Sequence, residues 1–338
     1  MLLSCNEVLL LNKYCQVALS SPYAWRLYRA ANIGTGVKHI NVSVIKTLLL
    51  PLPPLAEQRR IVERVNELMP LVEEYGGLED AREALDAALP GRLRKSVLQL
   101  AVQGGLVPQD PADEPAGVLL ERIRGQRRQL VAEKKMKAPK GGESIIFAGS
   151  DGRRYEKRVD ARGRESGPVC IEDEIPFEIP EGWEWARLES VIVLLSGTDL
   201  NSSLYNDRHE GIPYLTGASN FTDGKLIENR WTTEPSRVST KGELLFTCKG
   251  TIGEMAINRF GAAHIARQIM SITPNEHRML PYISLFLNAM VEDIKSHAKG
   301  VIPGIERNTL LARLIPVPPL AEESRIAEKY AELLNIFF

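Results

Sequence analysis

Two hydrophobic patterns divide the chain and predict a mixed architecture. Between residues 51 and 103, apolar side chains step alternately by four and three positions, at Ile61, Val65, Leu68, Val72 and Tyr75. This spacing is typical of a helix that pairs with another helix in a coiled coil. Between residues 181 and 315, short runs rich in β-branched residues are separated by glycine-containing turns, which predicts strands. We therefore expect an α/β or α+β domain together with long spacer helices.

An internal repeat relates the two ends of this pattern. Residues 51–68 read PLPPLAEQRRIVERVNEL, and residues 316–333 read PVPPLAEESRIAEKYAEL. The similarity extends upstream, where Tyr14 parallels Tyr282. The copies lie 265 residues apart, far more than the roughly 20–50 residues of a solenoid repeat. The sequence therefore predicts a duplication of two large units, the first of which is cut short at its N-terminus.

The long helix of the first copy has two interpretations. It could lie on its own domain as an amphipathic helix, or pair with the equivalent helix of the second copy, and the duplication favours pairing. Pro70, Gly76-Gly77 and Pro90 interrupt the apolar pattern. Because proline removes a backbone hydrogen bond and bends a helix, we expect two or three helical pieces rather than one rod.

Residues 104–180 are predicted to be a basic, flexible connector. The stretch begins with the turn-rich VPQDPADEPAG, and residues 121–140 hold eight Lys/Arg against two Glu. This basic run is either a solvated helix face or arm, or a segment that contacts phosphates independently of sequence. Residues 141–167 predict a weak hairpin within the connector.

Composition limits the class of protein. The 338 residues suggest about two domains, and 42 Lys+Arg against 43 Asp+Glu exclude a uniformly basic binder while leaving room for a local nucleic-acid patch. Four scattered cysteines without a C-x-x-C pair indicate neither a disulfide framework nor a zinc site, which favours a reducing, cytoplasmic location. No apolar run approaches the ~18 residues of a membrane span, and the N-terminal stretch is not typical of a signal peptide.

A search for catalytic motifs identifies none. The chain lacks a P-loop, a dinucleotide-binding G-x-G-x-x-G after a strand, a G-x-S-x-G elbow, an H-E-x-x-H zinc motif and the tetrapeptide expected of an amino-methyltransferase. The five histidines are dispersed and are interpreted as surface or loop residues. We therefore predict no catalytic residue, no cofactor and no metal in this chain.

Hydrogen-bond donors gather instead in the loops of the strand-rich region. Seven of these polar residues stand out: Thr216, Ser219, Asn220, Lys249, Thr251, Arg267 and Gln268. Arginine reads guanine and glutamine or asparagine reads adenine through paired hydrogen bonds, whereas lysine and threonine suit phosphates. In most proteins such residues are ordinary polar residues of turns. Here the internal repeat favours a DNA-binding role for them.

These motifs together resemble the specificity (S) subunit of type I restriction–modification systems. The repeated P-[LV]-P-P-L-A-E-x-x-R-I resembles the entry into that family's conserved spacer helices. EIPEGWEWARLE resembles the start of its second target-recognition domain, and GIPYLTGASN, KGELLFTCKGTIGEMAI and ARQIMSITP resemble motifs inside that domain. LRKSVLQLAVQGGLVPQDPADEPAGVLLERI resembles the end of its central conserved region.

The resemblance implies an organisation and a set of partners. Residues 1–50 would be the remnant of a first recognition domain, 51–103 the central spacer helix, 181–315 the second recognition domain, and 316–338 the start of a second spacer helix. Each recognition domain would read half of a bipartite site in double-stranded DNA, with two antiparallel helices setting the spacing. Modification subunits would bring S-adenosylmethionine and the methyltransferase site, and restriction subunits would cut, so the S subunit itself would catalyse nothing.

The chain departs from the family pattern at both ends. Only about 50 residues precede the first spacer helix, and the last helix stops at Phe338. One expectation is a half subunit that dimerises to restore two recognition domains and two spacers; another is a truncated copy. A truncated interaction protein that docks modification subunits without reading DNA is the alternative function, and an enzyme with an unrecognised site is a third.

Overall fold

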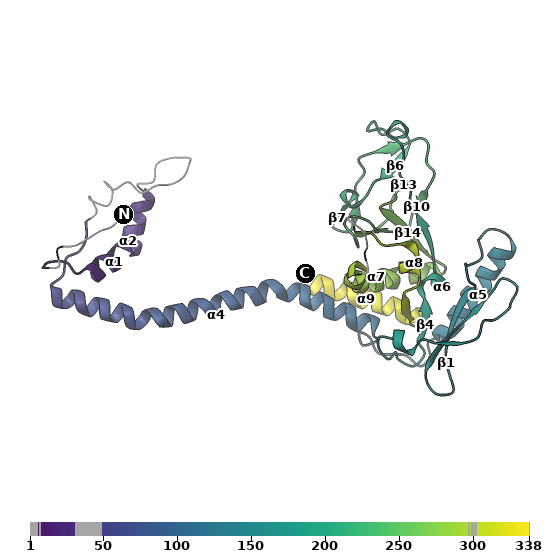
Figure 1. Ribbon diagram of the computed structural model, residues 1–338, viewed down its shortest axis with the longest axis horizontal. Coiled ribbons are helices and arrows are strands. Elements are labelled where there is room, and N and C mark those ends of the chain that lie inside the picture. Colours follow the sequence, from purple (N-terminus) through teal and green to yellow (C-terminus); the bar gives the residue numbers. More distant parts are fainter. Residues whose placement is uncertain (1–5, 7, 31–48, 297, 299–302, 338) are drawn as a thin grey trace. The chain divides into compact units, whose positions relative to one another are not determined.

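A computed structural model describes residues 6, 8–30, 49–296, 298 and 303–337 (Figure 1). The chain divides into two compact units, Met1–Leu89 and Pro90–Phe338, here called the N-terminal and C-terminal units. Among the described helices, none is both long enough and apolar enough to cross a membrane. The prediction of a mixed fold with a long helix is confirmed, because α4 spans Leu55–Val102 and strands dominate the middle of the C-terminal unit.

The long helix α4 is continuous, so the prediction of two or three helical pieces is wrong. Its 48 residues run through Pro70, Gly76-Gly77 and Pro90. Side chains around these positions are exposed, so water can bond the carbonyl group that each proline leaves unpaired. The surrounding sequence is rich in Glu, Leu, Ala and Arg, which are among the best helix formers. These favourable propensities outweigh the interruptions.

Among its described residues, the N-terminal unit contains two short helices before α4. They are α1 (Asn12–Leu19) and α2 (Pro22–Ala30), and α1 buries Tyr14 and Cys15. The prolines of the P-x-P-P motif stand just ahead of α4, where a missing backbone N–H costs no helical hydrogen bond. The carbonyl of Pro54 accepts from the backbone N–H of Gln58 at 3.0 Å and so starts the helix.

The centre of the C-terminal unit consists of two four-stranded sheets. One has the order β12 (Met255–Ile257), β11 (Leu244–Thr247), β14 (Ile269–Pro274), β5 (Ile192–Ser196), all antiparallel. The other has the order β10 (Val238–Thr240), β13 (Ala262–Ile265), β6 (Ile212–Leu215), β9 (Trp231–Thr232), with β13 and β6 parallel. The small pairs β15 (Leu314–Val317) with β4 (Glu184–Arg187), and β7 (Phe221–Thr222) with β8 (Lys225–Leu226), complete the strands of this region.

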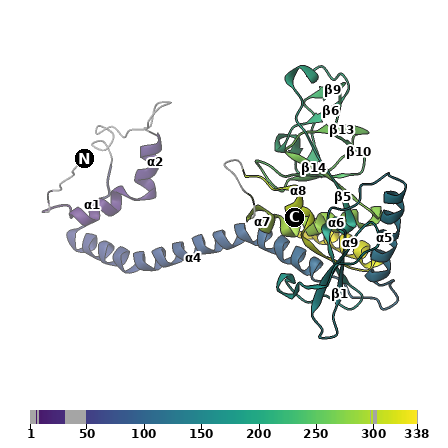
Figure 2. The ribbon, with the colours of Figure 1, turned by 45° about the vertical axis from the view of Figure 1, so that its right-hand side comes forward.

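Two large apolar clusters lie in this unit, besides a small one of Ile146, Ile171 and Trp185. Of the two large clusters, the smaller lies between the two sheets and contains Leu215, Leu245, Ile265 and Ile269, all 0% exposed. The larger surrounds the helices α6 (Leu188–Val191), α7 (Leu280–Ser296), α8 (Arg307–Leu311) and α9 (Leu320–Phe337). The sheet with β6, β13 and β10 lies at one end of the unit and α9 toward the other, with β14 between them (Figures 1 and 2).

The last turns of α4 join the larger cluster together with α9. Val97, Leu98 and Ala101 of α4 belong to the same buried cluster as Ile326 and Tyr330 of α9. The helices that open the two sequence repeats therefore share one core within the C-terminal unit.

Residues 104–180 contain regular structure rather than a flexible connector. They form α5 (Ala116–Ala132) and a three-stranded antiparallel sheet of β1 (Glu143–Ala148), β2 (Arg154–Val159) and β3 (Val169–Cys170). The basic run is partly taken up by this fold, because Arg127 is 8% exposed and pairs with Glu143 at 3.2 Å. Four of its eight cations, the lysines after α5, lie in the turn that leads to β1.

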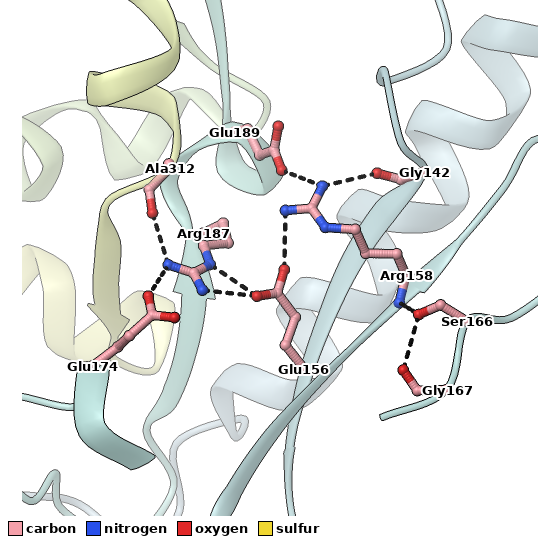
Figure 3. A network of polar contacts seen from close by, with 9 residues as sticks. All are labelled: Gly142, Glu156, Arg158, Ser166, Gly167, Glu174, Arg187, Glu189 and Ala312. Atoms are coloured by element: carbon pink, nitrogen blue, oxygen red, sulfur yellow. Dashed lines mark hydrogen bonds and ion pairs between the residues drawn. The ribbon is translucent and has the colours of Figure 1, made fainter. Parts of the chain in front are cut away.

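A network of charges around the buried pair Arg187 and Glu156 fastens this small sheet to β4 (Figure 3). Arg187 of β4 lies 2.7 Å from Glu156 of β2 and 2.7 Å from Glu174. Glu156 also pairs with Arg158 at 3.0 Å, and Arg158 reaches Glu189 at 2.9 Å. Burial is the largest single influence on Glu156 and opposes its ionisation, but the hydrogen bonds from Arg187 and Ser144 and the positive charges of Arg187 and Arg158 together outweigh it and lower the pKa of the carboxyl. Each buried charge thus has a partner, as burial requires.

The two sequence repeats use the same hydrogen bonds. The Tyr14 hydroxyl donates to the carbonyl of Pro51 at 2.9 Å, and the Tyr282 hydroxyl donates to the carbonyl of Pro316 at 2.8 Å. Each bond holds the helix that precedes the P-x-P-P motif against the start of that motif. The duplication predicted from the sequence is therefore a duplication of contacts as well.

The repeats differ at one buried position on the long helices. In the first copy, the Gln58 amide accepts from Leu11 N–H at 2.9 Å and donates to the carbonyls of Leu9 and Pro53. In the second copy the equivalent residue is Glu323, which is 1% exposed, and neither of its carboxylate oxygens has a hydrogen-bond partner among the residues that the structure describes. Burial raises the pKa of Glu323 well above its usual value, and the negative charge of Glu276 adds to this effect.

We expect Glu323→Gln to remove a loss of folding stability that the wild type shows as the pH rises. Because the folded pKa of Glu323 is raised, its contribution to stability is fully present below the unfolded value of about 4.5 and is lost as pH rises through the folded pKa. The glutamine variant should unfold at higher urea concentration than the wild type above that pKa. Urea unfolding between pH 4 and 9 measures this, with Glu328→Gln, an exposed site on α9, as control. Parallel pH profiles for wild type and Glu323→Gln would contradict it.

We expect Arg187→Met to destabilise the C-terminal unit by about 3–5 kcal/mol, because it leaves the buried Glu156 charge without its main partner. Urea unfolding gives the free energy, and hydrogen exchange of the β2 amides shows whether the small sheet loosens first. The matched control is Arg164→Met, which removes a surface ion pair to Asp160 next to the same sheet and should cost less than about 1 kcal/mol. Equal effects of the two variants would refute the network's role.

Candidate nucleic-acid interface

Three loops that are distant in sequence meet at one pocket of about 260 Å³ in the C-terminal unit. The pocket is lined by Ala218, Ser219, Lys249, Gly250, Thr251, Arg267 and Gln268. Five of the seven polar residues singled out in the sequence therefore line the same pocket. The remaining two, Thr216 and Asn220, lie outside it.

Arg267 and Gln268 occupy the tip of a tight turn. The turn connects β13 to β14 and is closed by the bond from Ile269 N–H to the carbonyl of Ala266, at 2.9 Å. The two residues are its central positions, so their side chains project from the end of the hairpin-like connection. The Arg267 side chain is 63% exposed. Its Nε lies 2.7 Å from a carboxylate oxygen of Asp199, a residue that sequence reasoning missed.

The loop that carries Lys249 and Thr251 joins β11 to β12 and is fixed through its backbone. Cys248 N–H donates to the carbonyl of Gln268 at 2.8 Å, which ties this loop directly to the Arg267 turn. Gly250 has φ of +78°, a conformation that favours glycine. A side chain at Gly253 would meet Val291 of α7 at 2.6 Å, so this glycine allows the loop to lie against the helix.

The third wall follows β6 and depends on Asn220. Asn220 is 0% exposed; its side-chain oxygen accepts from Thr216 N–H at 2.8 Å, and its nitrogen donates to the carbonyl of Ile227 at 2.9 Å. The Thr216 hydroxyl also bonds to Asn220. Because this amide is already occupied, we assign Asn220 and Thr216 to the frame of the loop rather than to base reading. Ser219 next to it remains exposed.

Gln268 is held by its surroundings on one side. A Cβ atom at Gly217 would lie 2.0 Å from the side-chain oxygen of Gln268. Gln268 therefore occupies the space that the side chain of any larger residue at position 217 would need. Gly217 thus leaves open the space that the Gln268 amide occupies. In the sequence, the one sign of this close approach between positions 217 and 268 is the glycine in the motif GIPYLTGASN.

His264 supports the floor beneath these loops, and its interpretation as a surface or loop residue is wrong. It is 0% exposed; one ring nitrogen lies 2.9 Å from the carbonyl of Thr198, and Nδ1 accepts from the N–H groups of Ser236 and Arg237 at 3.2 Å each. Burial lowers the pKa of His264. The neutral ring with its proton on Nε2 satisfies all three bonds.

The pocket presents positively charged side chains and hydrogen-bond donors to a ligand. Among its seven lining residues, two are cationic and none is acidic. Burial raises the pKa of the nearby Cys248 thiol to about 11, which leaves it protonated and unsuited to act as a nucleophile. Within the described ranges, no group of three or more His, Cys, Asp or Glu residues could hold a metal ion.

A second basic surface lies in the same unit. A groove of about 600 Å³ is lined by several cations, including Lys137, Lys140, Arg158 and Arg307. Arg307 donates to the carbonyl of Leu194 in β5, and burial lowers its pKa. Lys137 and Lys140 come from the basic run that the sequence singled out as a phosphate-contacting candidate.

Comparison with known proteins identifies the C-terminal unit. Residues 180–336 match the family model described as "Type I restriction modification DNA specificity domain". Over 97% of this chain, the sequence is 33% identical to the type I restriction enzyme EcoBI specificity subunit of Escherichia coli, of which it covers 63%. It is 25% identical to the EcoAI specificity subunit of the same organism, over 96% of this chain and 59% of that protein.

A solved structure shows a distant similarity of the same kind. The HsdS subunit from Thermoanaerobacter tengcongensis is 20% identical, with 98% of this chain and 65% of that chain covered and a TM-score of 0.45. The chain thus spans less than two thirds of these relatives. The domain match and the sequence relatives agree with the family resemblance drawn from the sequence motifs. The chain is thus similar to type I restriction enzyme specificity subunits, and its residues 180–336 match the DNA specificity domain of type I restriction–modification systems.

Proposed function

We propose that the C-terminal unit binds double-stranded DNA in a sequence-specific way through the pocket of Ser219, Lys249, Thr251, Arg267 and Gln268. The observation that carries the proposal is the convergence of three loops on this pocket, each bringing exposed or half-exposed donors. Arginine and glutamine can each form paired hydrogen bonds to a base edge, and lysine and threonine can hold the flanking phosphates.

The backbone architecture supports base reading. The three loops are joined by main-chain hydrogen bonds, such as the one from Cys248 N–H to the Gln268 carbonyl. The side chains at the pocket are therefore free to contact a ligand while the main chain keeps their positions. A preorganised set of donors loses less conformational entropy on binding than a set of mobile side chains.

The proposal gives the chain a directing role without catalysis of its own. Modification subunits would supply S-adenosylmethionine and methylate the DNA that this chain selects, and restriction subunits would cut unmodified DNA. The lysines at 137 and 140 would add sequence-independent contacts to the phosphate backbone, because they line a basic groove in the same unit.

We further propose that the chain acts as a half subunit that dimerises. Along α4 in the N-terminal unit, the apolar stripe predicted from the sequence is uncovered among the described residues: Leu68 is 40% exposed, Val72 57% and Tyr75 68%. Ile61 and Val65, at the start of the stripe, are half-buried. An exposed apolar stripe at coiled-coil spacing is suited to pair with another helix.

The same stripe supports the alternative function. A chain that docks modification subunits without reading DNA would also need an apolar surface for association. The two functions differ in what they require of the pocket: DNA reading needs Arg267 and Gln268, and docking alone does not.

A selection from random DNA duplexes decides between them. We expect the chain, purified together with a modification subunit, to enrich a symmetric bipartite motif, because two copies would each place one recognition domain on the DNA. Sequencing of the bound pool measures this. An enriched single half-site would retain the recognition function and refute dimerisation. Absence of any enrichment, with the protein complex intact, would refute DNA reading and leave the docking function.

Substitutions should separate base contacts from phosphate contacts. We expect Arg267→Ala or Gln268→Ala to relax the preference at particular base pairs, with a cost of about 1–3 kcal/mol for the preferred base. Lys137→Ala with Lys140→Ala should weaken binding to all sequences and reduce the slope of log affinity against log salt by roughly 0.9 per lost phosphate contact. Titrations at several salt concentrations test both. A uniform effect of all four substitutions on every sequence would show that the base-reading assignment is wrong.

A further inference from the structure

Asp199 lies at the edge of the pocket and is bonded to Arg267 at two points. One carboxylate oxygen accepts from the Arg267 backbone N–H at 3.2 Å, and the other lies 2.7 Å from Arg267 Nε. We propose that Asp199 is a positioning residue that aims the Arg267 guanidinium at one base pair. This inference rests on the proposed function, because it assumes that the pocket reads DNA.

The double contact leaves a defined part of the guanidinium available. Asp199 occupies the Nε edge, while Nη1 and Nη2 have no hydrogen-bond partner in the part of the chain that the structure describes. Two parallel N–H donors of this kind match the O6 and N7 acceptors of guanine in the major groove. An arginine fixed at its Nε edge therefore presents a guanine-reading pair of donors.

The position of Asp199 is set by the main chain on both sides of the Arg267 turn. Gly197 N–H donates to the carbonyl of Ile269 at 3.1 Å, and Thr198 N–H donates to the carbonyl of Ile265 at 3.0 Å. A Cβ atom at Gly197 would lie 2.2 Å from the carbonyl oxygen of Ala266, so only glycine allows this approach. The segment that carries Asp199 is thus joined to the turn before and after Arg267.

Stability alone does not account for the pair. The side chains of Arg267 and Asp199 are 63% and 44% exposed, and exposed ion pairs contribute little to folding. A carboxylate beside DNA also repels phosphates. By partly neutralising Arg267 it makes this arginine a poor phosphate contact and leaves it for the base edges. Lys249, which forms no ion pair among the described residues, has the opposite property and suits a phosphate.

The test uses the full chain with Asp199→Ala, Arg267→Ala and the double variant. The probes are the duplex enriched by selection, derivatives of it with each base pair changed in turn, and a random-sequence duplex. We expect Asp199→Ala to lower discrimination by about 5- to 100-fold at the same base pair that Arg267→Ala affects. The double variant should discriminate no worse than Arg267→Ala, because both changes remove one interaction.

Asp199→Ala should act in the opposite direction on random DNA. Removal of the carboxylate frees Arg267 for phosphates, so affinity for the random duplex should rise and its salt dependence should steepen, by up to roughly 0.9 in the log–log slope for one added phosphate contact. A merely structural role would lower affinity for every duplex and also lower the thermal midpoint. Asp160→Ala is the matched control, because Asp160 accepts from the backbone N–H and the Nε of Arg164 in the same manner, outside this pocket. It should leave discrimination unchanged.

A readout without DNA completes the test. The Arg267 Nε–H signal in nuclear magnetic resonance should exchange slowly with water in the wild type and fast in Asp199→Ala. Slow exchange in both proteins, or unchanged discrimination by Asp199→Ala where Arg267→Ala loses it, would overturn the positioning role and leave DNA reading intact. A wild-type chain without any base preference would instead overturn the proposed function, and this inference with it.

Discussion

The candidate site depends on a seam of main-chain hydrogen bonds around the turn between β13 and β14. Residues after β5, after β11 and within the turn itself bond to one another through Gly197, Thr198, Cys248 and Ile269. These bonds bring together segments from both four-stranded sheets. Buried His264 adds a side-chain bond to the same seam through the Thr198 carbonyl. Because the seam uses backbone groups, it does not depend on the polar side chains that line the pocket.

In the duplicated segments, by contrast, the equivalent contacts are hydrogen bonds made by side chains. Tyr14 and Tyr282 each fasten a helix to the first proline of the following motif. The copies have diverged at the neighbouring buried position, where the first has an amide with three hydrogen bonds and the second a carboxyl group without one in the described part of the chain. The same buried position thus holds a fully hydrogen-bonded glutamine in the first copy and a glutamate without such bonds to the described residues in the second.

Sequence patterns predicted local elements well and long-range contacts poorly. The alternation of apolar and polar residues with glycine turns indicated a strand-rich region, because side-chain period and turn residues are local properties. The repeat was visible because it conserves whole motifs. The pairing of Asp199 with Arg267 joins residues 68 positions apart and leaves no trace in either local segment. The order of residues 104–180 was missed for the same reason, since it depends on Arg187 meeting Glu156 across the sequence. The burial of Asn220 was not predicted, because burial is a property of the fold.

The separation of frame and side chains bears on how such a site can change during evolution. A pocket whose shape is fixed by the main chain can exchange its lining residues one at a time without unfolding, and so can acquire a new target through few substitutions. The Arg267–Asp199 pair limits that freedom. Loss of the arginine alone would leave a carboxylate facing the phosphates, so the two positions are coupled and are expected to be replaced together in descendants of this chain.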